Sequence, residues 1–210
     1  MDRPEGIAVS PKTGRVYVML TKNKKRTADQ ASGANPIAKN LHGHTLEIIP
    51  PTLSGTISHT AKSAKWDILL IGGDRNNHEH HAYYNKNTTA KGQLANPDNC
   101  AFDASGRHWI STVGAEKSFG SCDGLWACET DGAHRAKTRR FIRVPTGAEL
   151  CSPAFTPDNT TLFVAVQHPG DGRKTHLAAP KTKWPDFKDG IPPRPSVVAI
   201  THPSGKTIGS

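Results

Sequence analysis

A run from Pro97 to Gly106, Pro-Asp-Asn-Cys-Ala-Phe-Asp-Ala-Ser-Gly, followed by Trp109-Ile110, has a pattern that occurs twice more in this chain. One copy runs from Pro4 to Gly14 and into Val16-Tyr17-Val18, and the other runs from Ser152 to Asn159 and into Leu162-Phe163-Val164. Each copy is a short apolar run, a turn made of Pro, Asp, Asn or Gly, and a second apolar run. This order is typical of an antiparallel hairpin, so the sequence predicts three equivalent hairpins.

The spacing of these hairpins favours a β-propeller. Ala8, Ala101 and Ala154 hold the same place in the three copies and are 93 and 53 residues apart. These separations fit two blades and one blade, since a blade takes roughly 40–50 residues. Further runs bring the expected strands to about eleven; they are Thr45–Ile49, Trp66–Ile71, Gly124–Glu129, Arg139–Val144 and Ser196–Thr201. Residues 1–210 are therefore predicted to form an all-β propeller segment of about three blades, without a second domain.

Three blades leave a propeller open, because a closed ring needs at least about four. Either the chain is the C-terminal part of a longer protein, or other copies complete the ring. We expect the first, with missing N-terminal blades or another chain closing the propeller.

The net charge of +9 would attract nucleic acid, anionic membranes or phosphorylated substrates. Much of the excess lies in loop-like stretches such as 22–26 and 137–140, without the interleaved aromatic residues that stack on nucleic acid bases. We therefore interpret it as solvated loop charge and expect no nucleic acid partner. No apolar run approaches the ~18 residues of a membrane span, and the N-terminus does not have the layout of a secretory signal.

The cysteines Cys100, Cys122, Cys128 and Cys151 show no Cys-x-x-Cys spacing, which argues against a structural zinc site. Free, buried thiols are the expectation. Cys122 and Cys128, which flank a predicted strand, are the alternative disulfide pair.

Three acidic residues are the candidate metal ligands. Glu5 and Asp98 hold the same position in their repeats, and Glu149 lies two residues before the equivalent point at Cys151. Inner strands of propeller blades line one channel, so these carboxylates should converge and hold a hard cation such as Ca²⁺ or Mg²⁺. The alternative, which spacing alone favours equally, is that each acid caps a turn.

Arg3 precedes Glu5 by two residues, which places both side chains on one side of an extended strand. A guanidinium beside metal-held carboxylates suits a phosphate group, and a local ion pair is the alternative. The dense run His78-Glu79-His80-His81 lacks the spacing of a zinc motif, so we interpret it as an exposed loop. His44, at the head of a strand, could orient a ligand or bind a backbone carbonyl. No nucleophile elbow, P-loop or dinucleotide fingerprint occurs.

Several motifs, taken in order, resemble the PhoX-type alkaline phosphatases over nearly the whole chain. They are Asp2-Arg3-Pro4-Glu5-Gly6, Asn35-Pro36, Gly43-His44, Trp66–Asp74, Asn96-Pro97-Asp98-Asn99, Gly124-Leu125-Trp126, Gly147–Cys151, Phe155–Asp158, Leu162–Gly170 and Pro193–Ile200. The match corresponds to about the last third of a family member. Val113 departs from it, since the family usually has an acid there.

The resemblance implies a periplasmic or secreted propeller enzyme, exported by the twin-arginine route, that hydrolyses phosphate monoesters with Ca²⁺ and Fe³⁺. Carried over by residue, Arg3 becomes a catalytic phosphate ligand, Glu5 and Asp98 become metal ligands, and Glu149 is a further candidate. The family's iron-binding cysteine would lie upstream of Met1, so none of the four cysteines is expected to take that role. The competing hypothesis is a non-catalytic propeller segment that binds a partner.

Overall fold

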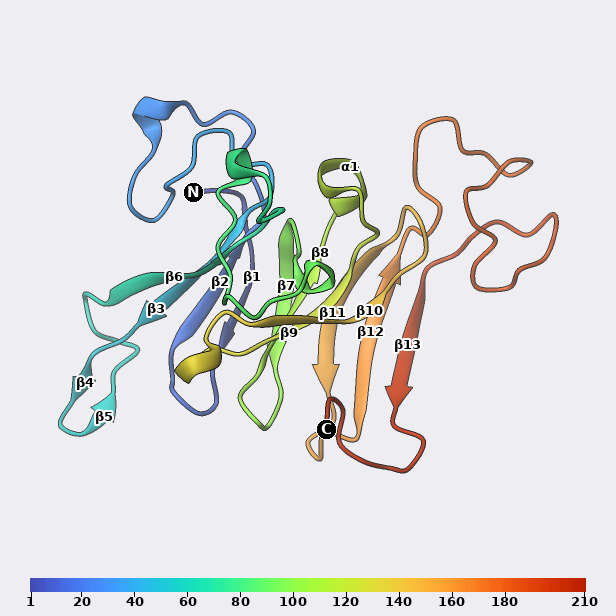
Figure 1. Ribbon diagram of the computed structural model, residues 1–210. Coiled ribbons are helices and arrows are strands. Elements are labelled where there is room, and N and C mark those ends of the chain that lie inside the picture. Colours follow the sequence, from blue (N-terminus) through green and yellow to red (C-terminus); the bar gives the residue numbers. More distant parts are fainter.

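The computed structural model describes residues 1–210, and nearly all of its regular structure is β-strand. Figure 1 shows three antiparallel sheets standing side by side in chain order. The first has the order β1-β2-β3-β6, the second β10-β9-β8-β7 and the third β11-β12-β13. Their bounds are β1 Pro4–Val9, β2 Val16–Leu20, β3 His44–Ile49, β6 Lys65–Ile71, β7 Pro97–Phe102, β8 His108–Thr112, β9 Gly124–Cys128, β10 Thr138–Arg143, β11 Glu149–Phe155, β12 Thr161–Gln167 and β13 Ser196–Thr201.

The remaining elements are short. A two-stranded hairpin, β4 (Thr52–Leu53) and β5 (Thr56–Ile57), projects from the first sheet. The single α-helix, α1, covers Ala115–Phe119, and the 3₁₀ turns are Ala28–Gln30, His78–His80, Ala90–Gly92 and Gly132–His134. No helix is long and apolar enough to cross a membrane. The all-β prediction is confirmed. Three large sheets and one two-stranded sheet are present, and their membership of a propeller of about three blades stays a prediction.

The turn of each repeated hairpin ends on a residue with a left-handed backbone. The φ angles are 61° at Gly14, 82° at Gly106 and 59° at Asn159. Gly and Asn are the residue types that tolerate this region, so the turn chemistry in the sequence sets the hairpins. The first strand of each large sheet also carries a register irregularity, between Pro4 and Ile7 in β1, at the equivalent place in β7, and between Cys151 and Ala154 in β11.

Two hydrophobic clusters hold the sheets together. Tyr17 and Met19 of the first sheet pack with Ile110 and Trp126 of the second. The opposite face of the second sheet packs against the third, through residues that include Trp109, Leu125, Leu150 and Val164. Successive side chains along the strands of the second sheet point to opposite faces, and both faces are buried because this sheet lies between the other two.

Strands β1, β7 and β11, which are the first strands of the three large sheets and are called the inner strands below, approach one another closely. Strand β7 contacts both β1 and β11. A Cβ atom at Gly6 would lie 2.6 Å from the carbonyl oxygen of Asp98, so this approach of β1 to β7 requires glycine. On the other side, the Ser152 amide donates to Asn99 Oδ1 at 2.9 Å. These contacts bring the first residues of the three inner strands into one region.

The four cysteines are free, as predicted, and the alternative disulfide between Cys122 and Cys128 is not formed. Only Cys128 is fully buried; the other three thiols are in half-buried residues.

Candidate active site

Asp98, the second residue of β7, is the most unusual side chain of the inner strands. It is only 6% exposed, and its carboxylate takes part in no hydrogen bond or ion pair within the chain. Burial, and then the charges of Glu5 and Glu149, raise its pKa to about 6. The Asp98 oxygens are not among the fully buried atoms that lack a partner, so they remain open to a group from outside. A largely buried acid with no partner in the chain has the environment of a ligand for a cation.

Asp123, just before β9, is a buried acid whose carboxylate accepts hydrogen bonds from several donors. It accepts hydrogen bonds from the Thr112 hydroxyl at 2.7 Å and from the amides of Gly114 at 2.6 Å and Ala115 at 3.0 Å. These bonds tie the start of α1 to the second sheet. Asp123 therefore has a structural role that explains its burial, whereas Asp98 has none.

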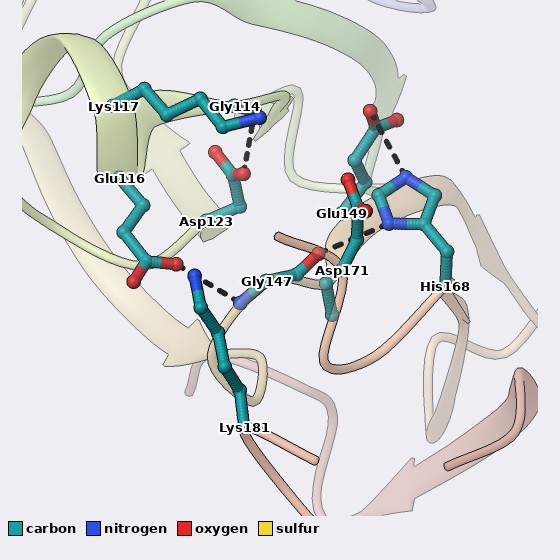
Figure 2. Close-up of a pocket in the computed structure, with 10 residues that line it drawn as sticks. Gly114, Glu116, Lys117, Asp123, Gly147, Glu149, His168, Asp171 and Lys181 are labelled. Carbon is teal, nitrogen blue, oxygen red and sulfur yellow. Dashed lines mark hydrogen bonds and ion pairs between the residues drawn. The ribbon is translucent and has the colours of Figure 1, made fainter. Parts of the chain in front are cut away.

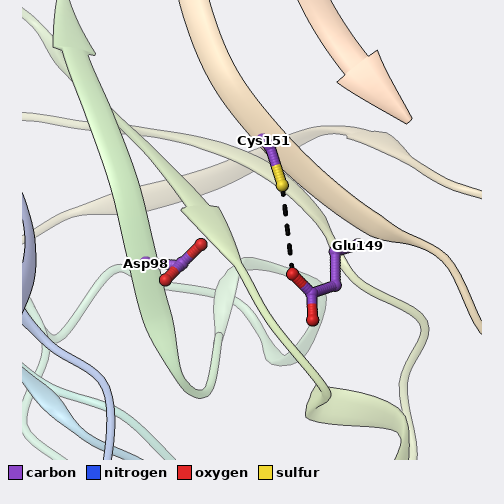
Figure 3. A group of neighbouring side chains, drawn as sticks. All are labelled: Asp98, Glu149 and Cys151. Atoms are coloured by element: carbon purple, nitrogen blue, oxygen red, sulfur yellow. Dashed lines mark hydrogen bonds between the residues drawn. The ribbon is translucent and has the colours of Figure 1, made fainter. Parts of the chain in front are cut away.

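Glu149 and Cys151, at the start of β11, face Asp98 (Figure 3). One ligand atom from each of the three side chains lies within 4.8 Å of the others. The Cys151 thiol is 3.9 Å from Glu149 Oε2 and donates to Gln167 Oε1 at 3.1 Å. The structure thus brings two of the predicted metal ligands together with a cysteine.

Arg3 and Glu5 form an ion pair at the beginning of β1. Arg3 Nη2 lies 2.8 Å from Glu5 Oε1, and the Arg3 side chain is 51% exposed. Glu5 is not one of the three clustered ligands, although its charge contributes to the raised pKa of Asp98. Because the pair uses only one terminal nitrogen of the guanidinium fork, Arg3 keeps donors for an anion.

Lys22 and His168 join the site from loops. Lys22 follows β2; burial and the neighbouring cations Lys24 and Arg3 lower its pKa, against the opposing charges of Asp123 and Glu149. His168 follows β12 and lies between the carbonyl oxygen of Gly147, 3.0 Å from Nδ1, and Glu149 Oε1, 3.3 Å from Nε2. Burial lowers the pKa of His168, but the contacts with Glu149 and Gly147 outweigh it and raise the pKa overall.

A pocket of about 250 Å³ opens beside Glu149 and His168 (Figure 2). Seven of its ten lining residues have ionisable side chains. Its lining residues are Gly114, Glu116, Lys117, Asp123, Gly147, Ala148, Glu149, His168, Asp171 and Lys181. Of the clustered side chains only Glu149 lines the pocket, so the pocket gives a small polar molecule access to that carboxylate.

A family model described as "Alkaline phosphatase PhoX" matches residues 1–170. The chain belongs to the PhoX alkaline phosphatase family.

Among solved structures, the chain is similar to Pseudomonas fluorescens PhoX in complex with vanadate, a transition state analogue. The identity is 32% and the TM-score is 0.82, over 100% of this chain and 35% of that chain. The chain therefore spans about a third of the length of this relative. No curated protein matches the sequence.

The other residues singled out in this PhoX-family sequence have structural partners. His44 Nε2 binds the carbonyl oxygen of Ala34 at 2.9 Å, which is the backbone alternative and not ligand orientation. In the turn His78–His81, three residues are exposed, as predicted, but His80 is half-buried and packs on His42 at 4.0 Å between ring centroids. The run forms no group of three ligands. Lys22, Asp123 and His168 were missed because they reach the site from loops that the repeat does not relate. Cys151 does carry a signal in the sequence, its position in the repeat, although the resemblance implies an iron-binding cysteine upstream of Met1.

Proposed function

We propose that this chain forms part of the active site of a metal-dependent phosphatase that hydrolyses phosphate monoesters. Membership of the PhoX family supports the reaction class. The single observation that carries the metal is Asp98, a residue only 6% exposed whose carboxylate has no partner in the chain and lies beside Glu149.

Glu5, Asp98 and Glu149 are the proposed metal ligands. Carboxylate oxygens suit Ca²⁺ and Fe³⁺, the ions implied by the resemblance to this family. A cation bound there would polarise the phosphoryl group and lower the pKa of an attacking water. The carboxylates position that cation, and the close approach of β1 to β7 at Gly6 fixes Glu5 relative to Asp98.

Arg3 is proposed to bind the phosphate group and to stabilise the charge that develops on its oxygens. Its ion pair with Glu5 at 2.8 Å orients the guanidinium without using all of its donors. Lys22, held half-buried near Asp123 and Glu149, adds positive charge on the same side. The polar pocket beside Glu149 would receive the alcohol part of the ester.

The rest of the site is proposed to come from residues outside these 210, in missing propeller blades of a longer polypeptide or in another chain. The match to 35% of the length of Pseudomonas fluorescens PhoX supports this view. The resemblance places the parent enzyme in the periplasm or outside the cell.

Binding measurements on the 210-residue chain test the assigned roles without requiring turnover. Calorimetric titration with Ca²⁺ should give binding that Asp98→Asn weakens by about tenfold or more, because the ion loses a charged ligand. Asp158→Asn, an exposed turn residue, is the control and should leave Ca²⁺ affinity unchanged. Equal Ca²⁺ affinity in Asp98→Asn and the parent would overturn the metal assignment.

Vanadate tests Arg3, since the related Pseudomonas fluorescens protein was solved with it. Arg3→Ala should keep Ca²⁺ affinity and weaken vanadate binding to the Ca²⁺-loaded chain, as a lost charge-assisted bond costs about 1.5–3 kcal/mol. Arg139→Ala, on the outer strand β10 and paired with Glu129, is the matched control. Vanadate affinity that is the same in Arg3→Ala would contradict the phosphate role.

A further inference from the structure

Cys151 stands at the ligand position of the third repeat. When Ala8, Ala101 and Ala154 are aligned, the residues three places earlier are Glu5, Asp98 and Cys151. The three lie at the beginning of β1, β7 and β11, near the register irregularity that each of these strands carries. Such irregularities re-aim side chains. The fold therefore presents a carboxylate, a carboxylate and a thiol from equivalent places.

The distances fit ligands of one ion. Cys151 Sγ is 3.9 Å from Glu149 Oε2, and both lie within 4.8 Å of an Asp98 oxygen. Metal bonds of about 2.3 Å to sulfur and about 2.0 Å to oxygen at a tetrahedral angle separate the two ligand atoms by roughly 3.5 Å. A small side-chain rotation closes the difference. Figure 3 shows the thiol and the two carboxylates turned toward a common space.

Asp98 gives an independent reason to place an ion there, because the carboxylate of this largely buried residue has no partner in the chain. Besides Glu149 and Asp98, Cys151 has a hydrogen-bond acceptor in Gln167, to whose Oε1 its thiol donates at 3.1 Å. That hydrogen bond holds the sulfur on the side of the acids. Loss of the thiol proton to solvent on metal binding would free the sulfur as a ligand.

We propose that Cys151 is a metal ligand and that, with Asp98 and Glu149, it forms a site for a divalent transition-metal ion. This inference rests on the proposed function, since it adds a sulfur ligand to the same carboxylates. A thiolate selects borderline ions such as Zn²⁺, Co²⁺ or Fe²⁺, whereas Ca²⁺ takes oxygen ligands. Three protein ligands leave a coordination position for water or a phosphate oxygen, as in catalytic sites.

Cobalt(II) is the probe, because a thiolate ligand gives it a charge-transfer band in the near ultraviolet and carboxylates do not. The parent chain titrated with Co²⁺ should develop this band with one thiolate per ion. Cys151→Ser should lose the band and bind Co²⁺ about tenfold or more weakly, while its Ca²⁺ affinity stays close to that of the parent. Cys100→Ser, the matched control in inner strand β7, should keep both.

Cys151→Asp separates the loss of a metal ligand from a loss of folding, because it places at this position the acid found in the other two repeats. It should bind Co²⁺ without the sulfur band and bind Ca²⁺ more tightly than the parent. Far-ultraviolet circular dichroism and thermal unfolding of each variant show whether the sheets are intact. If Cys151→Ser does not fold, the test is whether the sulfur-to-cobalt band seen in the parent is absent in Cys151→Asp.

The outcomes separate this inference from the proposed function. If Ca²⁺ binds normally and Co²⁺ gives no sulfur band in the parent, or if the band persists in Cys151→Ser or Cys151→Asp, the cysteine ligand is overturned and the carboxylate site stands. If neither ion binds the parent chain, both proposals fail.

Discussion

His108, at the start of β8, is a fully buried titratable side chain without a hydrogen-bond partner. Its ring stacks on Phe102 at 4.7 Å between centroids and lies 5.0 Å from the ring of Tyr17. Neither ring nitrogen has a hydrogen-bond partner, and burial lowers its pKa to about 3. The imidazole therefore acts as an aromatic filler of the first core cluster, and its neutral form is the one that the fold accepts.

Acid should destabilise the chain through this residue. The unfolded state titrates near the ordinary pKa of 6.5 and the folded state near 3, so between these values the unfolded state binds one more proton. Stability that is present above pH 6.5 is lost as the pH falls, by about 1.4 kcal/mol per pH unit. His42 and His44 also have pKa values lowered by burial and add to the acid response, so His108→Leu should reduce the slope by one proton's worth in urea unfolding measured from pH 7.5 down to about 4. The exposed control His134→Gln should leave the slope unchanged. An unchanged slope in His108→Leu would show that other groups govern the acid response.

At the same scale, the sequence predicts some site residues and misses others for a physical reason. Glu5 and Asp98 could be paired in advance because a repeat fixes where inner-strand side chains converge. Asp123 and His168 reach the same region from loops before β9 and after β12, where no periodic pattern relates them. Whether an acid is satisfied, like Asp123, or unpartnered, like Asp98, depends on hydrogen bonds between distant segments, which a single sequence does not encode locally.

At the scale of elements, Glu47 of β3 joins the first sheet to the second. Its side chain is 1% exposed and contacts Arg135 Nη2 at 2.8 Å and Arg15 Nη1 at 3.2 Å. The Tyr17 hydroxyl donates to the same carboxylate. Arg135 follows the turn after β9 and also reaches the exposed Asp67 of β6 at 3.0 Å. A buried carboxylate with three partners is thus a polar link between two sheets, in addition to the apolar cluster of Tyr17, Met19, Ile110 and Trp126 that they share.

Removing the charge of Glu47 should weaken this link. Glu47→Gln should lower the free energy of unfolding by about 2–3 kcal/mol, since a buried pair loses one partner and the arginines remain partly exposed. Asp67→Asn is the matched control: it loses a contact to the same Arg135, but Asp67 is 62% exposed, so the cost should stay below about 1 kcal/mol. Urea unfolding of both variants measures the difference. Equal effects would contradict a special role for the buried carboxylate.

The elements themselves were largely readable from the sequence. The three repeated hairpins follow from turn residues whose backbone is left-handed at Gly14, Gly106 and Asn159. Strands β4 and β5, of two residues each, were not predicted because so short a run carries no alternation. The third inner strand begins at Glu149, earlier than the expected Ser152, so Glu149 is a strand residue and not part of the preceding turn.

At the scale of the whole molecule, both ends of the row of sheets present apolar faces. Val197 of β13 and Phe163 of β12 are 73% and 41% exposed, and their strand register places them on one face. Ile7 and Val9 of β1 are exposed at the other end. The third sheet has three strands, and β13 pairs only with β12, so one edge of it is unpaired (Figure 1). The sequence predicted the three repeated hairpins, but which faces stay uncovered appears only when the layers are assembled.

These faces and this edge should make the isolated chain associate with itself. Exposed apolar sheet faces and free edges are the surfaces that other chains cover, and the proposed site lacks the ligands expected from outside these residues. Residues 1–210 are expected to form concentration-dependent oligomers in analytical ultracentrifugation and to leave an aryl phosphate unhydrolysed with Ca²⁺ and iron supplied. Replacing both Phe163 and Val197 by Lys should shift the chain toward monomer by placing like charges on the face, whereas Lys at the exposed turn positions Asp158 and Ser204 should not. A parent chain that is monomeric, unfolds cooperatively and turns over the phosphate ester would show that the three sheets need no further partner, for stability or for chemistry.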